Sequence, residues 1–243
     1  MNIDFTNQTV LITGATQGIG KQIAEDFFRL GAHLILTGTK QEEIKALNEA
    51  CSGQNGVYKK YYAVDFLDAC SLNSFLTELG SYERIDVCIN NAGINRISYI
   101  DETLIKDWED ILAVNLTAPF KIMREVSGCM KKNMYGRIIN ISSIFGSISK
   151  AKRSIYSASK FGLCGLTVAA ALDLAPFHVL VNSVSPGFVE TDLTKRILGD
   201  AEMKKIAGDI PLGRLATPDE ISKVILFLSS SHNTYITGQN IIV

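Results

Sequence analysis

The feature that restricts the fold most is a regular alternation of short apolar runs with longer helical patterns along the chain. The clearest helical patterns are Ile19–Leu30, Glu42–Ala50, Trp108–Met130 and Ile155–Ala175. Strands that alternate with helices of this length predict βαβ units and a parallel sheet. We therefore expect one α/β domain over residues 1–243, with a doubly wound parallel β-sheet and helices on both faces. The expected strands are Val10–Thr13, Leu34–Thr37, Val57–Val64, Val87–Asn90, Arg137–Ile141, Val179–Val184 and Asn240–Val243.

The segment at about 190–211 interrupts this rhythm. It follows the strand that ends near Val184 and carries mixed charge together with Gly199, Gly208 and Pro211. Ligands of open α/β folds bind beyond the carboxyl ends of the strands. We expect a helical lid over the substrate there; a solvated connecting helix is the alternative.

A glycine-rich loop follows the first strand directly. Gly14, Gly18 and Gly20 would permit a tight turn, and the next helix would present unpaired N–H groups and its positive dipole end to a pyrophosphate. Three glycines can also serve a turn alone, but their position in the first βα junction favours a dinucleotide in a Rossmann-like fold. The loop residues expected to bind the cofactor are Gly14, Thr16, Gln17, Gly18, Ile19 and Gly20.

Two more polar segments end strands at the same edge. Asp65 follows the third strand, and Asn90-Asn91-Ala92-Gly93 closes the fourth. Asp65 could be a helix N-cap, and the second segment could be only a turn. Their position at carboxyl ends of strands also allows Asp65, Asn91, Ala92 and Gly93 to contact a cofactor.

A catalytic group is predicted around Tyr156. Tyr156 and Lys160 are four residues apart at the start of a helix and therefore share one face. Ser143 ends the fifth strand 13 residues earlier in the chain. A phenol is a poor proton donor at pH 7, and an adjacent ammonium would lower its pKa towards the working pH. Ser143 would hold a carbonyl oxygen, and Tyr156 would exchange a proton with it.

Together these motifs resemble the short-chain dehydrogenase/reductase family, and the match covers essentially the whole chain. In this resemblance Asn115 matches a catalytic Asn that holds a proton-relay water through a kinked helix, and Lys160 also binds the nicotinamide ribose. The resemblance implies a ketone–alcohol oxidoreductase that commonly forms dimers or tetramers. The segment expected at the nicotinamide end comprises Pro186, Gly187, Val189 and Thr191.

The end of the second strand bears on the choice of cofactor. An NAD site places a carboxylate there for the ribose 2′-hydroxyl, but this chain has Gly38, followed by Thr39 and Lys40. We therefore favour NADP(H), with Thr39 and Lys40 near the 2′-phosphate, and keep NAD(H) as the alternative.

The residues expected to face the substrate do not identify a molecule. They are Asn95, Ile144, Phe145 and Phe188. The chain most resembles 3-oxoacyl-carrier-protein reductases and related sugar and polyol reductases. An acidic carrier protein would favour a basic patch beside the pocket, which Lys131 and Lys132 supply in part, whereas Phe177 stands where such reductases often have Arg. A sugar or other small ketone, and a non-catalytic NADP sensor, remain as alternatives.

The composition excludes several classes of partner. With 24 Lys and Arg against 25 Asp and Glu, the net charge is −1, so we expect no nucleic acid. No unbroken run of about 18 apolar residues predicts a membrane span, and residues 1–5 lack the pattern of a signal peptide. Scattered cysteines and three isolated histidines predict reduced thiols, a cytoplasmic location and no metal site.

The oligomeric state is also predicted from the sequence. The patterns at 108–130 and 155–175 carry large apolar residues on more than one face. Because one apolar stripe suffices to cover a protein's own sheet, the surplus predicts a two-fold contact between copies of the chain. Coverage by loops of the same chain is the alternative.

Overall fold

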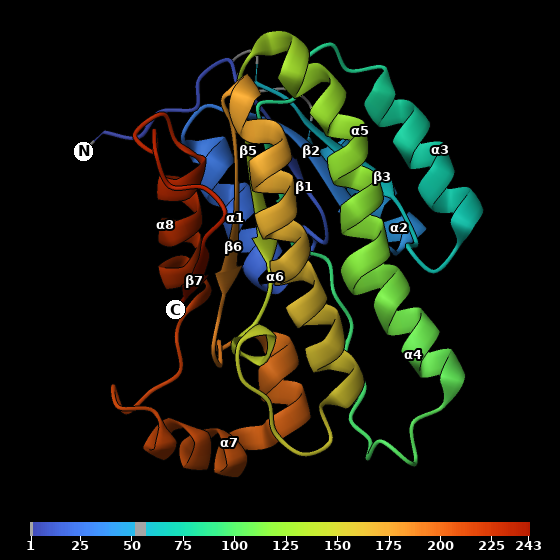
Figure 1. Cartoon of the computed structure of the whole chain (residues 1–243), viewed down its shortest axis with the longest axis vertical. Coiled ribbons are helices and arrows are strands. Elements are labelled where there is room, and N and C mark those ends of the chain that lie inside the picture. Colours follow the sequence, from blue (N-terminus) through green and yellow to red (C-terminus); the bar gives the residue numbers. More distant parts are fainter. Residues whose placement is uncertain (1, 52–56) are drawn as a thin grey trace.

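All the strands of the central sheet run parallel. The computed structural model describes residues 2–51 and 57–243, without the side chains of residues 192, 193, 197, 198 and 200. Within these residues the sheet has seven strands in the order β3-β2-β1-β4-β5-β6-β7 (Figure 1). This order confirms the doubly wound fold. The strands are β1 (Thr9–Ile12), β2 (His33–Gly38), β3 (Lys59–Ala63), β4 (Val87–Asn90), β5 (Gly136–Ile141), β6 (Val179–Ser185) and β7 (Asn240–Ile242).

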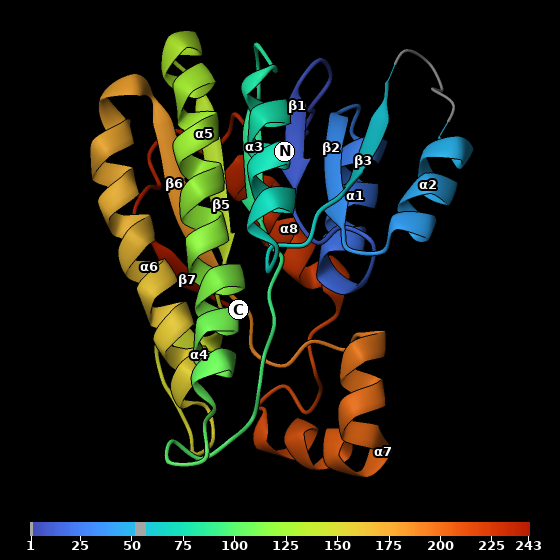
Figure 2. The same ribbon diagram turned by 90° about the vertical axis from the view of Figure 1, so that its right-hand side faces the viewer.

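Helices cover both faces of the sheet (Figure 2). The helices are α1 (Gly18–Arg29), α2 (Gln41–Ala50), α3 (Ala69–Gly80), α4 (Ile105–Leu112), α5 (Ala118–Asn133), α6 (Ser154–Leu174), α7 (Asp192–Asp209) and α8 (Pro218–Ser229). One face is covered by α1 and α8, and the other by α3, α5 and α6.

The alternation of side chains along β1 shows how the two cores form. Val10 and Ile12 pack with Phe27 of α1 on one face, whereas Leu11 packs with Ile122 of α5 on the other. In the sheet, Ile12 pairs with Leu36 on one side and Ile89 on the other. A central strand of a parallel sheet is buried on both faces, and all four residues of β1 are buried, with three apolar residues after Thr9.

The strand order changes direction between β1 and β4, and ligands of open α/β sheets bind beyond the carboxyl ends of the strands at such a point. Beyond the carboxyl ends lies α7, which is kinked at Gly199, where φ is 67°. The segment at 190–211 is thus helical and in the expected place. Its role as a lid stays a prediction.

The helical pattern at 108–130 is not one continuous helix, and its interruption lies at Asn115, where the family resemblance implied a kink. It begins earlier, at Ile105, and a π-helical turn at Ala113–Thr117 separates α4 from α5. A π turn inserts one residue into the helical repeat and therefore rotates the side chains on either side of it. This turn contains Asn115.

One segment, Ser154–Phe177, is long and apolar enough to cross a membrane by length and composition, although the sequence has no unbroken apolar run of that length. Its most apolar window has a mean hydropathy of 1.4 and is 39% buried. Leu163, Ala171 and Leu174 of this segment are buried within the protein, as in the core helix of a layered α/β domain.

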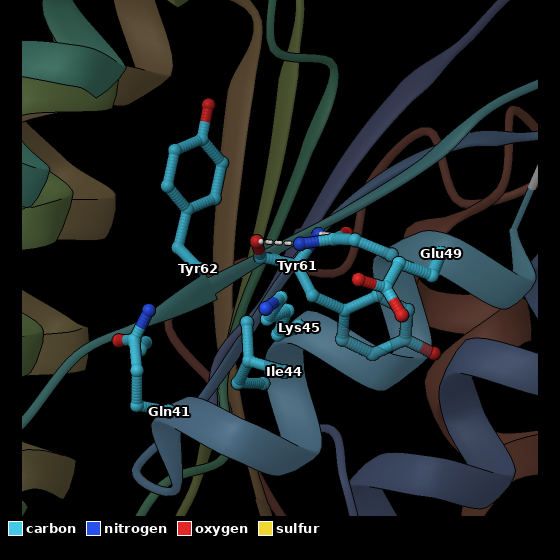
Figure 3. A pocket seen from close by; sticks show the side chains of 8 residues that line it. Gln41, Ile44, Lys45, Glu49, Tyr61 and Tyr62 are labelled. Atoms are coloured by element: carbon cyan, nitrogen blue, oxygen red, sulfur yellow. Dashed lines mark hydrogen bonds between the residues drawn. The ribbon is translucent and has the colours of Figure 1, made fainter.

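The edge strand β3 is bordered by α2. Asn48 of α2 accepts a hydrogen bond from the backbone N of Tyr61 at 2.8 Å and donates one to its carbonyl at 2.9 Å. Beside this contact lies an open hollow of about 590 Å³, which Gln41, Lys45 and Tyr62 also line (Figure 3). Since β5 is four strands away in the sheet, the hollow is not part of the predicted catalytic group.

Candidate active site

The glycine loop is fastened to the turn that follows β4. The Thr13 hydroxyl accepts hydrogen bonds from the backbone N of Asn91 and of Ala92, each at 3.0 Å. The Asn91 side chain donates to the carbonyls of Thr13, at 2.9 Å, and Gly14, at 3.0 Å. On the other side, the Thr37 hydroxyl accepts from the Gly14 backbone N at 3.1 Å. The Asn91 side chain therefore positions the loop.

The glycines are required by the shape of the loop. Gly14 and Gly18 have φ values of 64° and 55°, which L side chains rarely adopt. At Gly20 a Cβ atom would overlap the Gly14 carbonyl oxygen and the Asn91 amide nitrogen. Because these positions carry no side chains, the amino end of α1 packs directly against the loop. A ligand can then also approach the loop backbone closely.

The amino end of α1 fits a pyrophosphate. Its N-cap residue, Gln17, is exposed and makes no side-chain cap, and the first turn holds no acidic residue. The first N–H groups of a helix have no partner within it, and the helix dipole favours an anion there. A hollow of about 260 Å³ extends from this end along α1, and its lining includes Gly18, Lys21 and Thr191 as well as the carboxylates of Glu25 and Glu190. The uncapped end of α1 and the glycines of the loop therefore suit a dinucleotide phosphate, and binding of one by these residues stays a prediction.

The other predicted loop residues differ in exposure. Thr16 and Ile19 are half-buried, and Ile19 packs against the core. Asp65 is exposed and accepts a hydrogen bond from the Leu67 backbone N at 2.9 Å. It is not the N-cap of α3, because that residue is Asp68. A contact between Asp65 and a cofactor stays a prediction.

The end of β2 has no carboxylate. Thr39 and Lys40 are exposed, whereas Gly38 is buried. A Cβ at Gly38 would lie 2.5 Å from Thr16 Cγ2 and 3.0 Å from Ile44 Cδ1. The glycine therefore leaves room for its neighbours, and any side chain at this position would displace them.

The structure brings Ser143, Tyr156 and Lys160 together where β5 ends and α6 begins. Ser143 caps a short 3₁₀ turn, Ile144–Gly146, by accepting from the Phe145 backbone N at 3.2 Å. Lys160 is buried, and its ammonium donates to the Ile141 carbonyl at 2.8 Å. The same Nζ lies 5.7 Å from the centroid of the Tyr156 ring. A side chain at Gly93 would lie beside this ammonium, with its Cβ 3.6 Å away.

The electrostatics of this group differ from the sequence argument, which expected Lys160 to lower the pKa of Tyr156. Burial dominates and raises that pKa, while a hydrogen bond from Ser143 and the positive charge of Arg153 act in the opposite direction. Burial also lowers the pKa of Lys160 to about 8. Both shifts follow from desolvation, which disfavours the charged form of either group.

Asn115 joins this group from the π-helical turn. It is fully buried, and its side chain exchanges two hydrogen bonds with the backbone of Ile94, each at 2.9 Å. Its amide also donates to the Ser159 hydroxyl at 3.1 Å. Asn115 therefore links the segment after β4 to the helix that carries Tyr156 and Lys160.

The segment after β6 runs along the same edge. The carbonyl of Pro186 accepts from the Ile144 backbone N at 3.0 Å, and the backbone N of Gly187 donates to the Val243 carbonyl at 2.8 Å. Val189 is buried, and Thr191 caps α7 by accepting from the Thr194 backbone N at 3.1 Å. The backbone of 186–187 is thus held against the Ser143 turn.

The expected substrate residues have different environments. Phe145 is buried and meets the Tyr156 and Phe188 rings edge to face, with centroids 6.4 and 6.5 Å apart. Phe145 therefore packs against both of these rings. Asn95 is exposed, and Ile144 and Phe188 are half-buried. That they touch a substrate stays a prediction.

Two findings concern positive charge. Lys131 and Lys132 lie at the end of α5, and Lys131 Nζ stacks 4.8 Å from the Phe177 ring centroid. Phe177 follows α6, a helix of 21 residues or about 30 Å, whose opposite end carries Tyr156. These lysines are therefore not beside the catalytic group of their own chain.

Arg153 lies one helical turn before Tyr156 and is beside the catalytic group. Sequence reasoning missed Arg153, although its i, i+3 spacing to Tyr156 is visible in the sequence.

The arrangement can exchange a proton with a carbonyl oxygen. The hydroxyls of Ser143 and Tyr156 can both reach such an oxygen, and Tyr156 can donate its proton. A protonated Lys160 beside them favours the phenolate that remains. A nicotinamide cofactor, when bound, supplies or accepts the hydride.

Comparisons with known proteins agree with this geometry. A family model described as enoyl-(acyl carrier protein) reductase matches residues 14–243. The chain is 40% identical to the 3-oxoacyl-[acyl-carrier-protein] reductase FabG of Aquifex aeolicus over 98% of this chain and 96% of the relative. It is 35% identical to the same enzyme of Escherichia coli, with the same shares covered.

A solved structure is also similar throughout. A gluconate 5-dehydrogenase from Burkholderia cenocepacia, in complex with NADP and tartrate, has a TM-score of 0.90 and 26% identity, covering 99% of this chain and 94% of its own. Each comparison covers nearly the whole of both chains, so the similarity runs from the glycine loop to the last strand. The chain therefore belongs to the short-chain dehydrogenase/reductase family and is an NAD(P)-dependent oxidoreductase that interconverts a ketone and a secondary alcohol.

Proposed function

We propose that the protein uses NADP(H) in preference to NAD(H). The observation that supports this is the end of β2, where Gly38, Thr39 and Lys40 offer no carboxylate to a ribose 2′-hydroxyl. Lys40 is exposed at the N-cap of α2 and can pair with a 2′-phosphate. The NADP in the Burkholderia neighbour supports the same choice.

In the proposed reaction Tyr156 is the proton donor, Ser143 holds the carbonyl oxygen, and Lys160 stabilises the phenolate and binds the nicotinamide ribose. Asn115 fixes the position of the helix that carries them. The Ser143–Tyr156–Lys160 arrangement at the end of β5 carries this proposal.

The first substrate candidate is a 3-oxoacyl thioester, because the relatives at 35–40% identity are named for that reaction. The second is a keto or hydroxy acid of sugar size, as the gluconate 5-dehydrogenase likeness suggests. Arg153, a cation beside Tyr156, favours the second candidate.

We also propose that the protein is a homo-oligomer and works in the cytoplasm. Phe161, Val168 and Leu172 of α6 and Trp108 of α4 are 41–73% exposed, which leaves an apolar surface for a second copy. All five cysteines are free, as in a reducing compartment.

A spectrophotometric assay tests the function. NADPH oxidation at 340 nm would be followed with acetoacetyl thioesters, keto acids and neutral keto sugars, with Tyr156→Phe as the matched control. We expect turnover of at least one ketone by the natural chain and a large loss in the variant. Equal rates in both proteins would refute the assigned proton donor.

A further inference from the structure

The loop between the two catalytic hydroxyls has an unbalanced charge. Between Ser143 and Tyr156 the sequence contains Lys150, Lys152 and Arg153 but no Asp or Glu. In a chain with net charge −1, positive charge is thus concentrated in the segment that borders the substrate side of the site. Such a local excess is expected where an anion binds.

Arg153 is the member of this set that approaches the reacting group. Its guanidinium carbon lies 5.5 Å from the centroid of Phe145, the ring that meets both Tyr156 and Phe188 edge to face. Its positive charge acts on the Tyr156 hydroxyl. Lys150 and Lys152 are both exposed: Lys150 Nζ lies 5.8 Å from the Phe188 ring centroid, and Lys152 Nζ lies 4.5 Å from that of Tyr99.

The guanidinium has no hydrogen-bond or ion-pair partner among the residues that the structure describes. Its Nε is buried and makes no hydrogen bond, and the hydroxyl of the adjacent Ser154 is buried without one as well. No carboxylate contributes to the electrostatics of Arg153, and partial burial lowers its pKa. A buried donor without an acceptor is costly, and such groups are normally paired. These unpaired donors are consistent with an acceptor that arrives with the substrate.

We propose that Arg153 is a specificity-determining residue that binds a carboxylate of the substrate next to the carbonyl that reacts at Tyr156. A guanidinium pairs best with a carboxylate, in two parallel hydrogen bonds. The substrate class is therefore a keto acid or the corresponding hydroxy acid. This inference rests on the proposed function and selects its second substrate candidate.

The test compares two ketones that differ only in charge. The reduction of a 3-oxo acid and of its methyl ester by NADPH would be measured with the natural chain, Arg153→Gln, Arg153→Lys and the control Lys152→Gln. The measured quantity is the ratio of kcat/KM for acid to kcat/KM for ester. We expect Arg153→Gln to lower this ratio about 10–100-fold, the range for a hydrogen bond to a charged group. Arg153→Lys should retain much of the natural chain's acid-to-ester ratio, and Lys152→Gln should leave this ratio unchanged.

Other outcomes overturn the proposal. If Arg153 acts only on Tyr156, then Arg153→Gln slows acid and ester equally and shifts the pH profile. If it only stabilises the start of α6, the melting temperature falls and the ratio stays constant. A preference for acetoacetyl thioesters over the free acid, unchanged in Arg153→Gln, would also overturn it.

A binding measurement separates this inference from the proposed function. Calorimetric titration of the free 3-oxo acid into the Tyr156→Phe variant, loaded with NADP⁺, tests the carboxylate contact without turnover. The double variant Tyr156→Phe/Arg153→Gln should bind the acid at least about tenfold more weakly than the single variant. No turnover of any ketone by the natural chain refutes the proposed function. Turnover without charge discrimination refutes only the role of Arg153.

Discussion

Asn115 holds Ile94 through both polar groups of its backbone. The side-chain oxygen accepts from the Ile94 N and the side-chain nitrogen donates to the Ile94 carbonyl, each at 2.9 Å. The two residues belong to the π-helical turn and to the segment after β4, so this one amide sets the separation between them.

Replacing Asn115 with Asp keeps the shape but removes the donor. The Ile94 carbonyl and the Ser159 hydroxyl then lose their partner, and a carboxylate is buried. We expect Asn115→Asp to lower the free energy of unfolding by about 1–3 kcal/mol. Urea denaturation measures this loss, and an unchanged midpoint would contradict the role of the contact. Ser159→Ala removes the third hydrogen bond together with the one that the Ser159 hydroxyl donates to the Tyr156 carbonyl, and it should have a smaller effect because it buries no charge.

Tyr156→Phe removes the transferable proton while preserving the ring that packs on Phe145. We expect kcat to fall about 10²–10⁴-fold, the usual contribution of a general acid. Fluorescence titration with NADPH should give an affinity close to that of the natural chain, which shows that the loss is not one of cofactor binding.

Lys160→Met should raise stability while it abolishes activity. The pKa of Lys160 is lowered to about 8, so the folded protein binds fewer protons than the unfolded chain between about pH 8 and the unperturbed lysine value. The natural chain therefore gains stability as the pH rises through this window. The free energy of unfolding of Lys160→Met should therefore exceed that of the natural chain by its full amount below about pH 8, and this difference should disappear above about pH 10.5.

The size of that advantage follows from two opposing effects. Removing a buried charge stabilises the protein, whereas the Ile141 carbonyl loses its donor. We expect a net gain of about 1–2 kcal/mol at pH 7. Denaturant titrations of both proteins at pH 7 and at pH 10 measure it, and a gain that is equal at both pH values would contradict the assignment.

Cofactor choice is best tested at Thr39. A carboxylate at Gly38 would first collide with Thr16 and Ile44, so Gly38→Asp confounds packing with charge. Thr39 is exposed, and Thr39→Asp should weaken NADPH binding at least about tenfold while affecting NADH little. Thr39→Asn is the uncharged control. Equal affinities of the natural chain for NADPH and NADH would contradict the proposed preference.

The assembly can be tested with a charge on α6. Val168 and Leu172 are 48% and 73% exposed, whereas Leu166 packs against the core. Leu172→Glu should shift the molar mass in light scattering towards the monomer. Leu212→Glu is the control, because Leu212 is 80% exposed in the loop after α7. A monomeric natural chain at micromolar concentration would refute the oligomer.

Local patterns in the sequence predicted the strands well because a strand buried on both faces is rich in apolar residues, such as Val10–Ile12 of β1 and Ile138, Ile139 and Ile141 of β5. They also predicted which residues meet at the carboxyl edge. They did not predict the π turn around Asn115, since apolar spacing tolerates one inserted residue. Nor could they show that the Asn91 side chain holds the loop or that Arg153 has no partner, because both depend on contacts between distant segments.

The contact between Asn48 and Tyr61 has a consequence for the protein outside its reaction. β3 is an edge strand, and an edge with free N–H and C=O groups can add a strand from another molecule. At Tyr61 the Asn48 amide occupies both groups, as a neighbouring peptide would. The anchored α2 therefore blocks strand addition at this edge. If heating detaches α2 before the sheet unfolds, the edge of β3 becomes exposed. Aggregation of the heated protein should therefore begin at β3.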